Sequence, residues 1–223
     1  MSNFSRSDWG ARPARGGPGD LTPSRVEGIA LHWPGMSRPV HGVAAVSAAL
    51  RGWQNFHMDD REWSDIAYQE AVDQDGNSYT LRGLATQSGA NGDNDTNERF
   101  GALLLVLAPG EQPTAAMVAT VRARVAAHRA LFRSSKRIVG HSQIRPDGTT
   151  CPGPIAQRLI NDGEFEPTQE DDMPAYTEWP QKDRDALVAD IVKGLVSAPI
   201  DLGDGKRRAL KQVLKELWAK RNV

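Results

Sequence analysis

Apolar positions along the chain follow two different periods, which indicates a mixture of strands and helices. Short, continuous apolar runs are typical of buried strands, and they occur at residues 28–32, 102–107 and 138–140. Other segments place apolar residues at helical spacing and predict helices over residues 43–56 and 114–132, with a short closing helix at 154–159. The first 163 residues therefore carry enough alternating elements for one domain with a buried core.

Turn-forming and polar segments separate these elements. Asp75-Gly76 lies between two apolar segments, residues 66–72 and 78–82, and predicts a β-hairpin. Residues 86–99 show no apolar periodicity, so we expect a long surface loop there, a kind of loop that is often functional. Residues 1–27 contain several prolines and glycines and are expected to be extended and irregular.

The composition changes after residue 163. Residues 164–180 are acidic and contain proline, which predicts a linker. Beyond it, two amphipathic helices are expected at about 181–196 and 206–221. We therefore predict a first domain at 1–163, the linker, and a helical C-terminal region at 181–223.

Charge and composition exclude several classes of protein. The chain has 27 basic and 28 acidic residues, whereas a nucleic-acid-binding protein usually shows a basic excess. No apolar run approaches the roughly 20 residues of a membrane span, so integral membrane association is not expected. The first ten residues lack the apolar core of a secretory signal. The single cysteine, Cys151, excludes an internal disulfide.

Three residues could meet at a metal ion. His32 and His141 each stand at the end of a predicted strand, and Cys151 lies in a turn shortly after His141. A catalytic zinc site needs three protein ligands of this kind and one open position for water. By spacing alone, however, a histidine on an apolar strand is more often a structural residue.

Four segments together resemble one known family. They read SDWGAR at 7–12, LHW at 31–33, QNFHMDDREWSDIAY at 54–68 and VGHSQIRPDGTTCPG at 139–153. Their content and order are similar to those of peptidoglycan recognition proteins and phage lysozyme-type N-acetylmuramoyl-L-alanine amidases. The resemblance spans about residues 5–160. It implies an α/β fold in which helices flank a mixed central β-sheet.

The resemblance also implies a site and an activity. By position, His32, His141 and Cys151 match the family's zinc (Zn²⁺) ligands. Tyr68 matches the tyrosine that contacts the scissile carbonyl, and Thr149 matches a position that active members fill with Thr or Lys. The expected reaction is hydrolysis of the amide between N-acetylmuramic acid and L-alanine in bacterial cell-wall peptidoglycan.

Two alternatives within the same family stay open. A non-hydrolytic peptidoglycan-binding protein would keep the fold, but such members typically replace the cysteine that stands here at position 151. A host enzyme that recycles or remodels the cell wall would be the second alternative. Recycling amidases usually carry Asp at that place, which argues against this one.

The sequence departs from the family pattern after the catalytic tyrosine. Here Tyr68 is followed by Gln69-Glu70 instead of His/Asn-Phe. Side chains alternate along a strand, so Glu70 is expected on the same side as Tyr68, where it would serve as a proton shuttle or substrate contact. The alternative is a solvated or salt-bridged glutamate at a strand edge.

Four further residues are candidates for substrate binding. The loop at 88–97 lacks the family's histidine, so Asn91 and Asn94 are expected to contact glycan or peptide, unless they are ordinary turn formers. Trp33 would wall the groove or else belong to the core. Arg82 ends a hairpin strand and would meet a peptide carboxylate.

The setting suggested by these features is a phage endolysin. An amidase without a secretory signal would stay in the host cytoplasm until a holin releases it to the cell wall. Residues 205–223 carry seven Lys or Arg and one Glu. The C-terminal helices would bind the wall, join copies into a homo-oligomer, or pack on the first domain.

Overall fold

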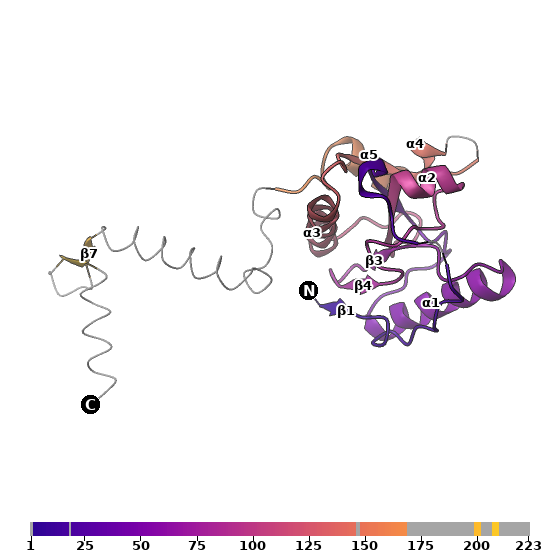
Figure 1. Cartoon of the computed structure of the whole chain (residues 1–223). Helices are drawn as coiled ribbons and strands as arrows, with labels where there is room; N and C mark the ends of the chain where they lie inside the picture. Colours follow the sequence, from indigo (N-terminus) through magenta and orange to yellow (C-terminus); the bar gives the residue numbers. More distant parts are fainter. Residues whose placement is uncertain (1, 18, 146–147, 169–198, 202–206, 210–223) are drawn as a thin grey trace, which may run out of the picture. The chain divides into compact units, whose positions relative to one another are not determined.

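A six-stranded mixed sheet forms the centre of the fold, with helices on both of its faces (Figure 1). The strand order is β1-β4-β3-β5-β2-β6. β3 and β4 form an antiparallel hairpin, and all other neighbouring strands are parallel. The expected α/β architecture with a mixed sheet is therefore confirmed.

The elements follow one another as the apolar pattern predicts, with small differences in their ends. The strands are β1 (Asn3–Phe4), β2 (Gly28–His32), β3 (Glu70–Val72), β4 (Ser78–Thr80), β5 (Phe100–Leu105) and β6 (Arg137–Gly140). The helices are α1 (Val43–Asn55), α2 (Asn94–Arg99), α3 (Ala115–Leu131), α4 (His141–Ile144) and α5 (Pro154–Asn161), with a 3₁₀ turn at Pro23–Arg25 and a π turn at Phe56–Asp60.

The computed structural model describes residues 2–17, 19–145, 148–168, 199–201 and 207–209. By its contacts the chain divides into two units, Met1–Asp172 and Met173–Val223. In the second unit, β7 (Pro199–Asp201) pairs with β8 (Arg207–Ala209) in an antiparallel manner. β8 replaces the start of the helix expected at 206–221; the rest of that helix and the one expected at 181–196 lie outside the described residues. The proposed linker and domain limits stay predictions.

No helix within the described part of the chain is long and apolar enough to cross a membrane.

Alternation along the central strands gives the sheet two apolar faces. Leu103 and Leu105 of β5 pack with Val121 of α3, whereas Leu104 packs with Leu50 of α1. Because successive side chains of a strand point to opposite faces, α1 and α3 cover opposite sides of the sheet. All six residues of β5 are buried, as expected for a central strand covered on both faces.

Two further segments, both in the first unit, differ from the sequence prediction. The loop expected at 86–99 contains α2, whose first amides are capped because Asp93 accepts a hydrogen bond from the Thr96 amide. The N-terminal segment is tied to the domain, since β1 pairs with β4 and Trp9 is fully buried with its indole N–H donating to the Thr80 carbonyl. Both corrections come from hydrogen bonds and burial that local apolar periodicity does not report.

Candidate metal centre

The sheet brings the two candidate histidines together. β2 lies between β5 and β6, and Leu31 is in register with Gly140. His32 is the last residue of β2, and His141 follows β6 directly as the first residue of α4. Because parallel strands end at the same edge of a sheet, the two rings meet there, with their centroids 4.6 Å apart.

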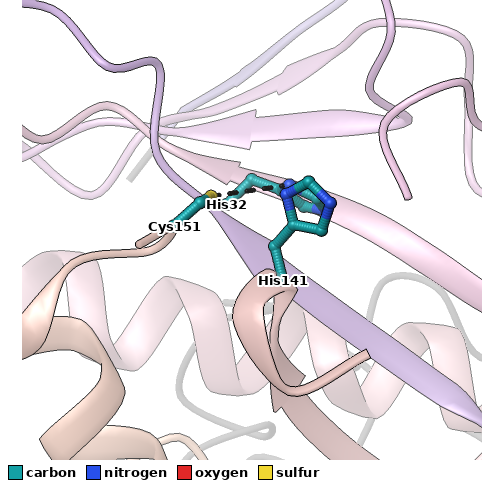
Figure 2. A group of neighbouring side chains, drawn as sticks. All are labelled: His32, His141 and Cys151. Atoms are coloured by element: carbon teal, nitrogen blue, oxygen red, sulfur yellow. Dashed lines mark hydrogen bonds between the residues drawn. The ribbon is translucent and has the colours of Figure 1, made fainter. Parts of the chain in front are cut away.

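Cys151 completes the group from the turn before α5 (Figure 2). Its backbone is held from two sides: the Thr149 hydroxyl accepts from the Cys151 amide (3.1 Å), and the Ser142 amide donates to the Cys151 carbonyl (2.8 Å). The Trp33 amide donates to its sulfur at 3.3 Å. The Cys151 Sγ atom lies 3.7 Å from the Nδ1 atom of His32.

This donor set fits a zinc ion. One ligand atom from each of His32, His141 and Cys151 can be chosen so that all three lie within 4.8 Å of one another. Tetrahedral zinc with its usual bond lengths would separate a sulfur and a nitrogen ligand by roughly 3.6 Å, close to the observed 3.7 Å. In addition, the His141 Nε2 atom is buried and has no hydrogen-bond partner among the described residues.

Burial sets the protonation of these ligands. It lowers the pKa of His32 to about 3, with the neighbouring His141 acting in the same direction, so the ring is neutral at neutral pH and has a free nitrogen lone pair. Burial also raises the pKa of the Cys151 thiol to about 11, although the hydrogen bond from the Trp33 amide lowers it. Metal binding at this group must therefore displace the thiol proton, a displacement that zinc coordination favours.

Tyr68 stands beside the group. Its ring packs edge-on against His32, with a centroid distance of 5.4 Å. Burial raises the pKa of its phenol, and the nearby Cys151 adds to this effect, so the hydroxyl keeps its proton. A neutral phenol at this place is a hydrogen-bond donor toward a carbonyl oxygen near the candidate ion.

A cavity of about 300 Å³ reaches toward Tyr68 through two ring contacts, although neither Tyr68 nor the three candidate ligands line it. Trp63 lines it and stacks on His57 at 5.1 Å, and the His57 ring packs in turn against Tyr68. The His57 Nδ1 atom accepts a hydrogen bond from the Ala67 amide, so this histidine is held in place by the backbone. The cavity is lined by Trp63, Ser64, Arg82, Gln87, Ser88, Gly89, Gly92, Asp93, Asn94 and Asn97.

Glu70 is not at this group, and the prediction of a proton shuttle is wrong. Its carboxylate forms a bidentate ion pair with Arg124 of α3, at 2.7 and 2.8 Å. Tyr68 instead packs with the cluster on the α1 side of the sheet. The expected alternation fails because Tyr68 lies before β3, where the Gln69 carbonyl accepts from the amides of both Leu81 and Gly83 and interrupts the ladder.

Asn91 is enclosed in the domain, which argues against the expected contact with substrate. The residue is fully buried, and its side-chain oxygen lies 2.9 Å from the His32 Nε2 atom. Its amide nitrogen donates to the Phe100 carbonyl at 2.7 Å. The asparagine that replaces the family's histidine therefore lies directly behind a candidate metal ligand.

The other three candidates for substrate binding occupy different surroundings. Asn94 is exposed at the start of α2 and lines the cavity. Arg82 also lines it, but its guanidinium already donates to the carbonyls of Ile66 and Gln87. The Trp33 ring packs over Gly153, where an added Cβ would lie 2.6 Å from a ring carbon. Trp33 is half-buried, so both of its alternatives stay open, and substrate contact by Asn94 and Arg82 stays a prediction.

Sequence reasoning missed the supporting role of Ser88 and Asn97. The Asn97 side chain accepts from the Asn91 amide and from the Ser88 hydroxyl, at 2.8 and 3.1 Å. Trp63 was also missed as a cavity wall, although it lies inside the segment at 54–68. The polar, non-periodic character of the 86–99 segment was the available signal, since buried polar side chains in a loop need partners.

Comparison with known proteins supports this assignment of the domain. The sequence profile described as N-acetylmuramoyl-L-alanine amidase matches residues 22–154. Proteins named N-acetylmuramoyl-L-alanine amidase from Mus musculus and Sus scrofa are 33% and 32% identical over 161 and 151 residues, which are 70% and 66% of this chain. The matched region covers only 29% and 25% of those two relatives.

A solved structure shows the same fold. Wild-type PGRP-LB from Drosophila superposes with a TM-score of 0.63 at 23% identity, covering 74% of this chain and 95% of that one. At this level of identity, the similarity concerns the fold. Together with the match over residues 22–154, it shows that the chain belongs to the N-acetylmuramoyl-L-alanine amidase family.

Proposed function

We propose that this protein hydrolyses the amide bond between N-acetylmuramic acid and L-alanine in bacterial peptidoglycan, with a zinc ion held by His32, His141 and Cys151. The main support is that these three side chains converge beside Tyr68, with one ligand atom of each within 4.8 Å of the others. Family membership supports the reaction, and the names of the mouse and pig relatives describe the same activity for those proteins.

The protein's own groups have separate parts in this reaction. When bound, zinc supplies a water molecule of lowered pKa and polarises the scissile carbonyl. The protonated Tyr68 hydroxyl donates a hydrogen bond to the oxygen on which negative charge develops, and one such donor typically contributes about 3–4 kcal/mol. Thr149 fixes the turn of Cys151 through its hydroxyl, and we propose that the same hydroxyl also orients water or substrate.

Retention of Cys151 favours an enzyme over a non-hydrolytic peptidoglycan-binding protein. The cysteine is buried and its sulfur lies against His32, where a binding protein would need no thiol. The cavity of about 300 Å³ is lined by polar side chains and one aromatic ring, which suits a peptide or sugar. A cell-wall recycling enzyme is the less favoured alternative.

The test is hydrolysis of purified peptidoglycan by the full chain, with release of new L-alanine amino termini as the readout. We expect activity that is lost on chelation, returns with zinc, and is absent in Cys151→Ala. The neighbouring Thr150→Ala, at an exposed position, is the matched control and should retain activity. Full activity after rigorous chelation would refute the zinc mechanism, and binding of peptidoglycan without hydrolysis would favour the receptor alternative.

We propose further that the protein acts as a phage endolysin, held in the host cytoplasm until a holin opens the membrane. The basic segment at 205–223 supports attraction to anionic wall polymers. Expression of the full chain inside bacteria should leave the cells intact until the membrane is permeabilised, and then lyse them. Sedimentation of the same protein would show whether it forms a homo-oligomer. Failure of permeabilised cells to lyse would overturn the endolysin role.

A further inference from the structure

We propose that Asn91 is a positioning residue that fixes the tautomer of His32, so that the hydrogen stays on Nε2 and Nδ1 faces the metal. The effect of this tautomer on metal binding rests on the proposed zinc function, whereas the tautomer itself can be measured without metal. It replaces the substrate contact expected for Asn91 by a role that acts through a ligand.

The orientation of the Asn91 amide follows from its partners. The Phe100 carbonyl can only accept a hydrogen bond, and it lies 2.7 Å from the Asn91 nitrogen. The same nitrogen donates to the Ser88 hydroxyl at 3.2 Å. Both of its hydrogens are thus used, and the side-chain oxygen must be the atom that faces His32, at 2.9 Å from Nε2.

This orientation decides which ring nitrogen carries hydrogen. An amide oxygen can only accept, so the Nε2 atom of His32 must donate. In a neutral imidazole the other nitrogen then holds a lone pair. That atom, Nδ1, lies 3.7 Å from the Cys151 sulfur, on the side of the ring where the candidate ligands meet.

The contacts around Asn91 keep it in this position. Its backbone amide donates to the Asn97 side chain at 2.8 Å, and the Ser88 hydroxyl donates to the same oxygen at 3.1 Å. Asn91 and His32 are 0% and 1% exposed, so water cannot substitute for a lost partner without rearrangement. Buried polar groups with a complete set of partners are rigid, which suits a residue that orients a ligand.

Two substitutions at the same place separate this role from mere packing. Asn91→Leu removes the acceptor, whereas Asn91→Asp keeps an acceptor for Nε2 but replaces the donor nitrogen by a carboxyl oxygen that faces the Phe100 carbonyl. The matched control is Asn77→Leu: Asn77 is 8% exposed and its hydrogen bonds go to Asp73 and the Ser2 amide, neither of which belongs to the metal group. It should destabilise the fold and leave His32 unchanged.

The first readout is the ¹⁵N resonance of the His32 ring in metal-free full-length protein, which reports the protonated nitrogen. The second is zinc affinity, measured by competition with a chelator. We expect Asn91→Leu to give mixed tautomers and about 10–100-fold weaker zinc binding. Asn91→Asp should keep hydrogen on Nε2 and an affinity close to that of the unaltered protein.

Two results would overturn the inference: an unchanged tautomer and zinc affinity in Asn91→Leu, or an equal loss of affinity in Asn77→Leu. The proposed function fails separately. If the unaltered protein binds no zinc, yet hydrogen sits on Nε2 and moves in Asn91→Leu, the tautomer assignment is supported while the zinc mechanism falls.

Discussion

Replacement of Arg124 by methionine is expected to destabilise the protein strongly, because it leaves the Glu70 carboxylate buried without a partner. The Glu70 side chain is 6% exposed and that of Arg124 is 22% exposed, and two hydrogen bonds of 2.7 and 2.8 Å join them. Removal of one member of such a pair typically costs about 3–5 kcal/mol. In a domain of this size, that loss lowers the melting temperature by roughly 6–20 °C.

The double variant Glu70→Leu/Arg124→Met should recover most of this loss, because a buried ion pair can be replaced by apolar side chains at little net cost. Burial raises the pKa of Glu70, opposed by Arg124, so the deficit of Arg124→Met should shrink as pH falls and the carboxyl takes up a proton. Urea denaturation of the unaltered protein, Glu70→Leu, Arg124→Met and the double variant measures the coupling energy between Glu70 and Arg124.

The same series tests the structural assignment of Glu70. Since its carboxylate faces α3, Glu70→Gln should hydrolyse peptidoglycan at a normal rate at temperatures where it is folded. A loss of less than about 1 kcal/mol in the free energy of unfolding of Arg124→Met would show that the ion pair does not stabilise the fold as described. The structural assignment is refuted if Glu70→Gln keeps its stability and loses turnover.

Three other predictions follow from the geometry. Tyr68→Phe should reduce turnover by about 10²–10³-fold with little change in zinc content, which steady-state kinetics and metal analysis will show; a normal rate excludes the proposed donor. Burial lowers the pKa of His128 to about 4, so the unfolded state binds more protons than the folded state between pH 6.5 and 4. The free energy of unfolding should therefore decrease by up to roughly 3 kcal/mol as pH falls through this range. His128→Leu should flatten this slope in urea titrations at several pH values, and parallel curves would contradict the assignment. Gly28→Ala would place a Cβ atom 2.2 Å from the Arg137 carbonyl oxygen, so it should separate β2 from β6 and weaken zinc binding. The control is Gly52→Ala on α1, whose added Cβ meets nothing within 4 Å and should leave zinc affinity unchanged.

The parts of the fold that the sequence predicts are those in which one local pattern suffices. Residues 28–31 and 102–107 are apolar throughout because both faces of their strands are covered, and the structure places β2 and β5 there. The helix over 115–131 likewise follows from apolar spacing and is capped by the hydroxyl of Thr114. Local pattern could not reveal β1, whose two residues pair with a strand far along the chain.

The site was predictable to the extent that its residues stand in recognisable segments. His32, His141 and Cys151 converge as the resemblance implied. Glu70 was misplaced because strand alternation was extended across residues where the ladder is interrupted. The burial of Asn91 could not be predicted, because a polar residue in a polar segment gives no local sign that its side chain lies against a candidate ligand.

The position of β2 in the sheet has a consequence for how the protein is made. This strand is fully apolar in its first four residues and lies between β5 and β6, both of which come much later in the chain. During synthesis its backbone hydrogen-bonding groups stay unpaired until β5 has left the ribosome, and those that face β6 stay unpaired until residues beyond Arg137 have followed. Truncations that end before β6 would expose one long edge of β2, so they should aggregate rather than accumulate as smaller folded proteins.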